Sequence, residues 1–160
     1  MPQSPTPHDL DTGTLALFVG FAAASTVQAE LDARGHADLR MSHGYVFQHL
    51  LYGRPTVGEL AEKLDMTQQG ASKAVAELER LGYIERLPDP GDARVRRVAL
   101  TARGRAAVAT ALSARAALDE RLRRRFGAPT VDAARALLAE VLEELGGTAA
   151  VRHRAVRPPR

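Results

Sequence analysis

Residues 56–64 carry the pattern of a short amphipathic helix with a defined start. Thr56 and Glu59 stand at the spacing of a capping box, in which each side chain accepts a hydrogen bond from the other residue's backbone amide. The apolar residues that follow recur at i, i+3, i+4 and i+7, and they are Val57, Leu60, Ala61 and Leu64. This stretch is therefore predicted to be one helix that buries a single face.

A second helix is predicted immediately afterwards. Asp65 and Met66 form the turn, Thr67 is placed to cap a helix that runs to residue 81, and Gly82 stands where a left-handed C-terminal cap belongs. The positions that share one face, and that we expect in the core, are Ala71, Ala74, Val75, Leu78 and Leu81. Two helices joined by so short a turn predict a helix-turn-helix, whose second helix can enter a DNA major groove.

The next segment predicts a β-hairpin rich in arginine. Residues 83–87 and 95–100 are compatible with strands, and Pro90-Gly91 between them suits a tight turn. The hairpin has four cations and three anions: Arg86, Arg94, Arg96 and Arg97 against Glu85, Asp89 and Asp92. A hairpin that follows a helix-turn-helix is a wing.

Three pieces of this region, residues 78–86, 89–94 and 100–104, resemble the MarR family of bacterial winged-helix regulators. The resemblance implies a sequence-specific double-stranded DNA-binding transcriptional regulator, a ligand-responsive repressor that binds a pseudo-palindromic operator as an interlocked homodimer. It also implies that Asp92 holds Arg94 in place, and that a crevice accepts a small aromatic or anionic effector. The expected fold class is mainly α with a small β-hairpin wing, a winged helix-turn-helix plus a helical dimerisation frame.

The rest of the chain is organised around this region. We expect a disordered N-terminal arm over residues 1–10 and a single domain over 11–147, with dimerisation helices at about 11–35 and 101–147 and the winged helix-turn-helix at about 42–100. A basic tail is expected over 148–160. Ser42, Thr101 and Thr130 are predicted to cap helices. The Leu- and Ala-rich terminal helices have more apolar surface than a small winged domain can bury, which favours a dimer with two-fold symmetry over the alternative, a three-helix bundle within a monomer.

Candidate DNA contacts follow from the helix faces. The outward positions in the first half of the second helix are Gln68, Gln69, Ser72 and Lys73, whose amides and ammonium suit base edges and phosphates. Thr56 and Thr67 place helix N-termini near phosphates, although capping alone explains both. Arg94 is the minor-groove candidate. Arg96 and Arg97 point to opposite faces, so at most one of them can share the DNA side.

Evidence for a ligand is weaker. Aromatic and histidine side chains gather in the first two helical segments, and the pocket candidates are Phe18, Phe21, His43, Tyr45, Phe47 and His49. Core packing explains them at least as well. With no cysteine and no His-x-x-x-His spacing, neither a metal site nor a cofactor is expected.

Composition limits the remaining classes. A net charge of +3 means that any nucleic-acid surface must come from local clustering. The first residues lack the features of a signal peptide, and no apolar run approaches the ~20 residues of a membrane helix, so a cytoplasmic protein with no membrane partner is expected. Ser42-His43 cannot act as a catalytic pair because neighbours on a helix do not face each other, and no phosphate loop is present, so an enzyme is not expected. The remaining alternative is a winged-helix module that binds protein or RNA without operator specificity.

Overall fold

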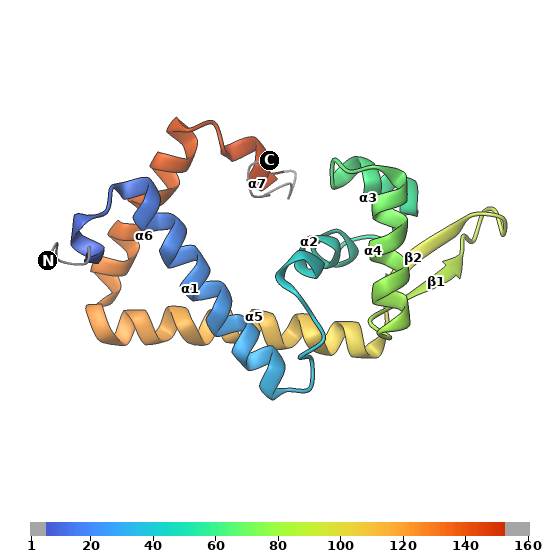
Figure 1. The fold of residues 1–160 in the computed structure, drawn as a ribbon, viewed down its shortest axis with the longest axis horizontal. Helices are drawn as coiled ribbons and strands as arrows, with labels where there is room; N and C mark the ends of the chain where they lie inside the picture. The colour runs from blue at the N-terminus through green and yellow to red at the C-terminus, as the bar shows by residue number, and fades with distance from the viewer. Residues whose placement is uncertain (1–5, 153–160) are drawn as a thin grey trace, which may run out of the picture.

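The computed structural model describes residues 6–152 and is mainly helical, with one two-stranded antiparallel hairpin. The elements are η1 (Pro7–Asp9), α1 (Thr12–Ala33), α2 (Met41–Leu50), α3 (Val57–Lys63), α4 (Gln68–Arg80), β1 (Ile84–Pro88), β2 (Arg96–Leu100), α5 (Ala102–Phe126), α6 (Ala128–Glu144) and α7 (Thr148–Arg152). Figure 1 shows α5 along the base, with α1 crossing it, α6 rising from one end and the winged helix-turn-helix at the other. The expected fold class is confirmed.

The helix-turn-helix forms as its caps predict. Thr56 Oγ1 accepts from the Glu59 amide at 3.2 Å and Glu59 Oε2 accepts from the Thr56 amide at 2.7 Å, which completes the capping box of α3. Asp65, in the turn, has a φ of 46°, a left-handed conformation that is uncommon outside glycine. Gly82 ends α4 with a φ of 79°, and the amides of Gly82 and Tyr83 bond back to the carbonyls of Glu79 and Leu78.

The wing pairs in simple antiparallel register, from Ile84 opposite Leu100 to Pro88 opposite Arg96. Beyond this hairpin, the Val98 amide donates to the Pro55 carbonyl at 2.8 Å. The base of the wing is thereby fixed to the segment that enters α3.

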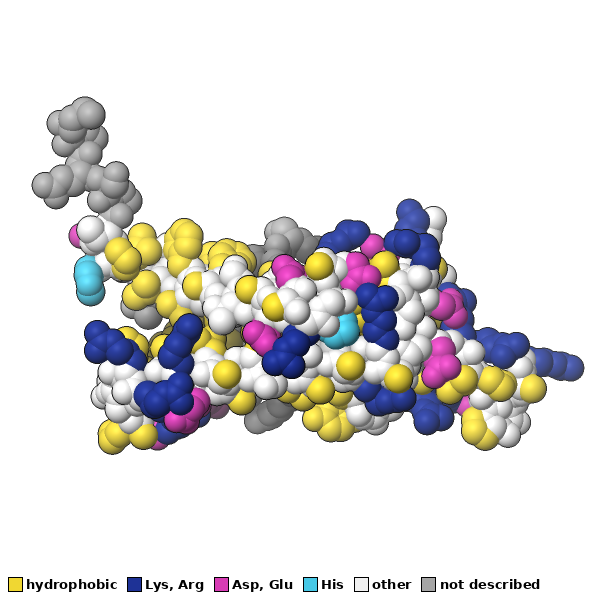
Figure 2. Space-filling model, turned by 90° about the horizontal axis from the view of Figure 1, so that it is seen from below, with side chains coloured by type: hydrophobic (Ala, Val, Ile, Leu, Met, Phe, Trp, Pro, Cys, Tyr) yellow, Lys and Arg dark blue, Asp and Glu magenta, His cyan; other side chains and the backbone are white. Residues whose placement is uncertain are grey.

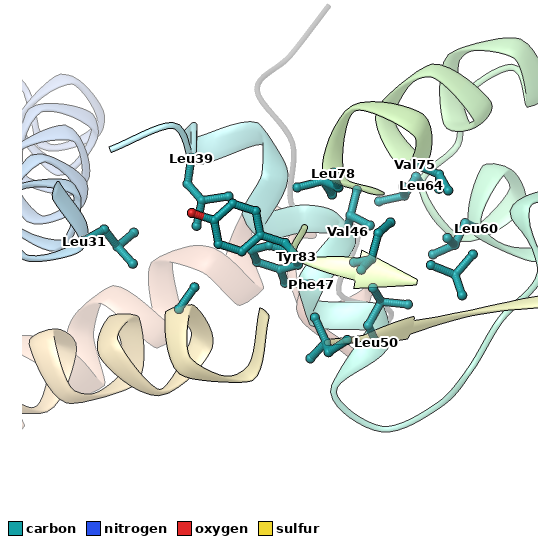
Figure 3. Close-up of a cluster of buried hydrophobic side chains, with 14 of the residues drawn as sticks. Leu31, Leu39, Val46, Phe47, Leu50, Leu60, Leu64, Val75, Leu78 and Tyr83 are labelled. Atoms are coloured by element: carbon teal, nitrogen blue, oxygen red, sulfur yellow. The ribbon is translucent and has the colours of Figure 1, made fainter. Parts of the chain in front are cut away.

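One core joins the winged region to the helices below it. Figure 3 shows Leu60, Leu64 and Val75 on one side of this cluster and Leu31 and Leu39 on the other, with Tyr83 and Phe47 between them. Tyr83 is fully buried, and its ring centroid lies 6.1 Å from that of Phe47. Residues from α1 to α5 thus share this cluster, so that α2 and α4 pack against common neighbours.

We call α1, α5 and α6 the helical frame. In it, α1 packs along α5, and α6 leaves α5 at a corner where Gly127 has a φ of 86°. Arg123 at this corner pairs with Asp119 and with Asp132, and Arg135 pairs with Asp119. Within the run 123–125, Arg123 is therefore half-buried in a network that fixes the direction of α6, whereas Arg124 and Arg125 are exposed.

Several boundaries differ from the sequence expectations. The helix α2 begins at Met41 with Arg40 as N-cap, not with Ser42, and α6 begins at Ala128, so that Thr130 lies inside its first turn beside Pro129. Short helical segments, η1 and α7, occur where an irregular arm and tail were expected. Residues 1–5 and 153–160 of that arm and tail lie outside the described residues.

The expectation about membrane-length apolar runs was wrong for α1. This helix is long and apolar enough to cross a membrane by length and composition. The prediction counted only uninterrupted apolar runs, and Thr, Ser, Gly and Gln interrupt those of α1. These residues carry no charge, and the first charged residue of α1 is Glu30, so the mean hydropathy of the helix stays high. The exposed large side chains of α1 are Leu15, Leu17, Phe18, Val19 and Phe21.

Candidate nucleic-acid interface

The outer face of α4 is polar and accessible. Gln68, Gln69, Ser72 and Lys73 are all exposed, whereas Ala71, Val75 and Leu78 on the opposite face are buried. The 3.6-residue period separates the two faces as predicted. Amide and ammonium groups on the first turns of a helix are well placed to meet base edges when that helix enters a major groove.

The helix N-termini of α3 and α4 offer a second kind of contact. Thr67 Oγ1 accepts from the Gly70 amide at 3.1 Å, and Thr56 Oγ1 is likewise occupied by its capping bond. Each threonine hydroxyl oxygen therefore already accepts a hydrogen bond from an amide of its own helix. The N-terminal amides of the two helices still give partial positive charge that suits phosphate.

The loop of the wing is organised by two aspartates. Asp89 Oδ1 accepts from the amides of Gly91 at 2.8 Å and Asp92 at 3.3 Å. The Val95 amide bonds to the Asp92 carbonyl at 2.9 Å, which places Ala93 and Arg94 at the centre of the hydrogen-bonded turn. The turn is thus displaced from Pro90-Gly91, the pair that the sequence favoured.

Asp92 orients Arg94 differently from the expectation. Its Oδ1 accepts from the backbone amide of Arg94 at 2.9 Å, and no described residue pairs with the guanidinium of Arg94. The carboxylate thus fixes the backbone of the turn and leaves the cationic end of Arg94 exposed. Arg96 is also exposed and unpaired within residues 6–152.

Arg97 has a different environment. It is half-buried, its Nε pairs with Asp89 Oδ2, and its Nη1 lies 3.1 Å from the Arg54 carbonyl and 3.4 Å from Glu59 Oε2. The hydrogen bond from Arg97, together with that from the Gly91 amide, holds the pKa of the Asp89 carboxyl below its usual range. Of the two alternating arginines, Arg96 is therefore the exposed one, whereas Arg97 locks the wing to the start of α3.

Cationic side chains project from the wing end of the molecule. In the view of Figure 2, dark-blue side chains extend from the end where the wing lies, while the frame end shows a hydrophobic patch together with further basic and acidic side chains. The net charge of +3 is small, so this local clustering is what gives the wing end its positive character.

Sequence comparison agrees with this geometry. Residues 37–95, from the approach to α2 through the wing loop, match the MarR family. The winged helix-turn-helix of this chain is thus similar to that of the MarR family. No curated protein gives a match to the sequence.

Solved structures extend the MarR likeness to most of the chain. The reduced form of MarR from E. coli is 24% identical, with a TM-score of 0.65 over 83% of this chain and 97% of that chain. A mutant of MepR from S. aureus bound to an oligodeoxyribonucleotide is 20% identical, with a TM-score of 0.62 over 85% of this chain and 99% of that chain. YusO from Bacillus subtilis is 20% identical, with a TM-score of 0.64 over 81% and 92%. The MarR-like fold thus includes the helical frame.

A cavity of about 150 Å³ lies between α1, α2 and α5 of this MarR-like fold. Of the pocket candidates, Phe47 lines it, together with apolar residues such as Val27, Leu31 and Val108. The other candidates do not line it. Phe18 and Phe21 are exposed on α1, His43 is buried against α4, and Tyr45 and His49 are half-buried elsewhere on α2.

Sequence reasoning missed the polar groups of this cavity, Arg40 and Arg115 among them. Arg40 precedes α2 and Arg115 lies in the middle of α5, 75 positions apart in the chain. No local pattern could join them, because the two residues line one cavity only through the packing of α1 and α2 against α5.

Proposed function

We propose that this protein is a sequence-specific double-stranded DNA-binding transcriptional regulator that binds a pseudo-palindromic operator as a homodimer and acts as a ligand-responsive repressor in the cytoplasm. The observation that carries the proposal is the exposed polar face of α4 beside a wing with two unpaired arginines, Arg94 and Arg96, at one end of the described chain (Figure 1). On this arrangement α4 meets base edges in the major groove, and the wing meets the phosphates and the adjacent minor groove.

The exposed face of α4 argues against a protein-binding module. Such a module needs apolar or aromatic anchors at the centre of its contact surface. The exposed positions of α4 between Gln68 and Ala76 are polar or small. An RNA-binding module is separated from the proposed function by the competition experiment below.

The homodimer is supported by the surface of the frame. The helix α6 has no buried residue in the single chain. Leu137, Leu138 and Leu142 are exposed on it, and so is Leu145, its C-cap residue. The alternative, a monomeric three-helix bundle, would need these side chains buried, so their exposure favours the dimer. A second copy that covers α1 and α6 would remove this apolar surface from water, and the two copies would then present two α4 helices to a two-fold DNA site.

The cavity between α1, α2 and α5 supports a ligand response. Its walls are mostly apolar, with arginines at two points, so it suits a small aromatic or anionic compound. It lies between the frame and the winged region, where an occupant would contact both.

Selection from a random duplex library tests the main proposal. We expect enrichment of one pseudo-palindrome whose half-site centres lie about 10 bp apart, because each α4 of a two-fold dimer meets one half-site. Transcription in vitro from a promoter that overlaps this site should fall when the protein is added. Competition with the RNA of the same sequence should not displace the duplex. A library with no enriched sequence, or displacement by the RNA, would exclude the regulator in the form proposed.

The dimer is tested by sedimentation equilibrium of the parent and a Leu138→Glu variant. The parent should sediment as a dimer at micromolar concentration, and the variant should dissociate because a carboxylate would be placed in the apolar contact. Tyr52→Glu, which changes an exposed ring outside the frame, is the matched control and should remain dimeric. A folded parent of 17.2 kDa in solution would rule out the frame as an interface.

A further inference from the structure

Arg103, in the first turn of α5, connects three parts of the chain. Its Nη1 donates to the Leu81 carbonyl at 2.9 Å, and its Nη2 lies 3.0 Å from Asp38 Oδ2 and 3.5 Å from the Gly35 carbonyl. Leu81 is the C-cap of α4, whereas Gly35 and Asp38 belong to the segment between α1 and α2. One guanidinium therefore joins the start of α5, the end of α4 and the connection from α1 to α2 (Figure 1).

The contacts of Arg103 are directional, unlike the apolar contacts around them. The core cluster also joins the winged region to α5, but hydrophobic burial has no preferred direction and lets packed helices slide by small amounts. A planar guanidinium, with its donors in a fixed fork, accepts only a narrow range of partner positions. Of the side-chain hydrogen bonds among the described residues, those of Arg103 are the ones that connect α5 with both other parts.

Arg103 binds the end of α4 that is remote from the candidate base-reading residues. Gln68 and Gln69 lie at the other end of this 13-residue helix, about 20 Å away. A rotation of α4 by about 10° about its C-terminal end would displace them by about 3.5 Å, close to the rise of one base pair in DNA. A small change of angle at Leu81 is therefore magnified where the helix meets DNA.

The same contacts stabilise the fold only weakly, because they lie near the surface. The side chain of Arg103 is 44% exposed and that of Asp38 is 33% exposed. Ion pairs with this exposure contribute little to the free energy of folding. Loss of the Arg103 guanidinium is therefore expected to leave the chain folded and to free the angle between α4 and α5.

We propose that Arg103 is a positioning residue that sets the spacing between the two DNA half-sites accepted by a dimer of this chain. In a two-fold dimer, the distance between the two α4 helices depends on the angle that each makes with its own frame. The Arg103 contacts hold this angle at one value, so the dimer accepts one spacing and rejects a duplex that is one base pair longer or shorter. This inference rests on the proposed function, since it assigns a determinant of specificity to the same DNA-binding surface.

The test measures affinity by fluorescence anisotropy for three duplexes. The two selected half-sites are kept at the selected spacing in one duplex, and are moved one base pair closer or further apart in the others. Each step changes the separation by about 3.4 Å and the relative rotation of the half-sites by about 34°. The parent should bind the two altered duplexes at least about tenfold more weakly, because the two α4 helices cannot then dock together.

Arg103→Met keeps the aliphatic part of the side chain and removes the guanidinium. At the selected spacing it should bind about tenfold more weakly than the parent, because only a fraction of the molecules then has α4 at the required angle. Its preference between spacings should fall below about threefold for the same reason. Its affinity for a duplex with a single half-site should equal that of the parent within about twofold, since one α4 meets one half-site at any angle to the frame.

Arg105→Met is the matched control. It also removes a cation from the start of α5, but within the described residues the side chain of Arg105 bonds to the Leu100 carbonyl, at 2.7 Å, and not to α4 or to the segment before α2. This variant should keep the spacing preference of the parent.

Asp38→Asn approaches the same contact from the other side. It removes the negative charge that faces Arg103 and keeps an oxygen that can accept the hydrogen bond of the Tyr83 hydroxyl. It should relax the spacing preference in the same direction as Arg103→Met, and it carries the test if Arg103→Met does not fold.

The outcomes separate this inference from the proposed function. If Arg103→Met and Asp38→Asn keep the spacing preference of the parent, Arg103 does not set the spacing and the inference fails, while the regulator proposal stands. It also fails if the parent binds all three spacings equally, or if Arg103→Met loses affinity for the single half-site, because the loss would then lie in α4 itself. If the parent has no preferred duplex at all, the proposed function itself fails, and the inference fails with it.

Discussion

The hydroxyl of Tyr83 donates a 2.5 Å hydrogen bond to the carboxylate of Asp38, which joins the entrance of the wing to the segment between α1 and α2. Arg103, from the start of α5, lies 4.4 Å above the Tyr83 ring and 3.0 Å from Asp38. Burial, followed by the hydrogen bond to Asp38, raises the pKa of Tyr83 to about 12, and the same hydrogen bond lowers the pKa of Asp38. Three elements that belong to the frame and the winged region therefore meet at one phenol.

Tyr83→Phe should lower the free energy of unfolding at pH 7 by about 1.5–3 kcal/mol, the usual worth of a hydrogen bond to a charged partner. The pKa of Tyr83 is raised in the folded state from an ordinary value of 10.0, so its contribution is present below pH 10 and is lost as the pH rises through about 12. Urea unfolding of both proteins between pH 7 and pH 11 measures this. The difference between them should narrow above pH 10, and parallel profiles would show that the phenol is not linked to folding.

Gly104 in the first turn of α5 tolerates no side chain. A Cβ at this position would lie 2.0 Å from the Tyr83 carbonyl oxygen, which also accepts the Thr101 amide at 3.0 Å. Because the obstructing atom belongs to the backbone, Gly104→Ala should lower the free energy of unfolding by about 3 kcal/mol. Gly44→Ala, on α2 with no atom within 4 Å of the added Cβ, is the control and should be neutral or stabilising. Equal unfolding midpoints for the two variants would contradict the close approach.

Local patterns explain why the winged region could be predicted from the sequence. The caps at Thr56 and Thr67, the apolar period of α4 and the left-handed Gly82 are each encoded within a few residues. The start of α2 was misplaced because Ser42 resembles a cap, whereas the structure caps the helix at Arg40. Where a residue could cap a helix or lie inside it, tertiary contacts determine which role it takes, and a short stretch of sequence does not contain these contacts.

The two wing arginines at positions 94 and 97 should behave differently when removed. Arg94→Ala should weaken binding to duplexes with A·T-rich flanks and reduce the dependence of affinity on salt. The reason is that the substitution removes an exposed guanidinium that would contact the phosphates and the minor groove. Arg97→Ala should instead free the base of the wing from Asp89 and from the Arg54 carbonyl. Hydrogen exchange of the Val98 and Val95 amides measures this and should accelerate only in Arg97→Ala. Identical exchange in both variants would refute the locking role of Arg97.

Gln69→Ala and Lys73→Ala test base recognition by α4. Each should reduce the discrimination between the selected duplex and a duplex with one substituted base by about 1–3 kcal/mol if the side chain pairs with a base edge. Both residues are exposed, so stability should not change. A uniform loss of affinity on every duplex would instead assign the residue to phosphate contact.

The candidate site was only partly accessible to sequence reasoning, for a physical reason. Gln69 and Arg94 could be selected because a helix face and a turn are local properties. The roles of Arg97 and Arg103 depend on carboxylates that lie in other parts of the fold, Asp89 and Asp38. Of the ligand candidates, Phe47 lines the cavity between α1, α2 and α5, whereas Phe18 is exposed on α1.

The central claim is that this chain recognises a DNA sequence. The most direct measurement is the equilibrium affinity for the selected duplex and for a shuffled duplex of equal length and composition, by fluorescence anisotropy at one physiological salt concentration. We expect the selected duplex to bind at least about 10³-fold more tightly, the lower end of the range for specific regulators. Equal affinities for the two duplexes would contradict the account, because α4 would then contribute charge and no recognition.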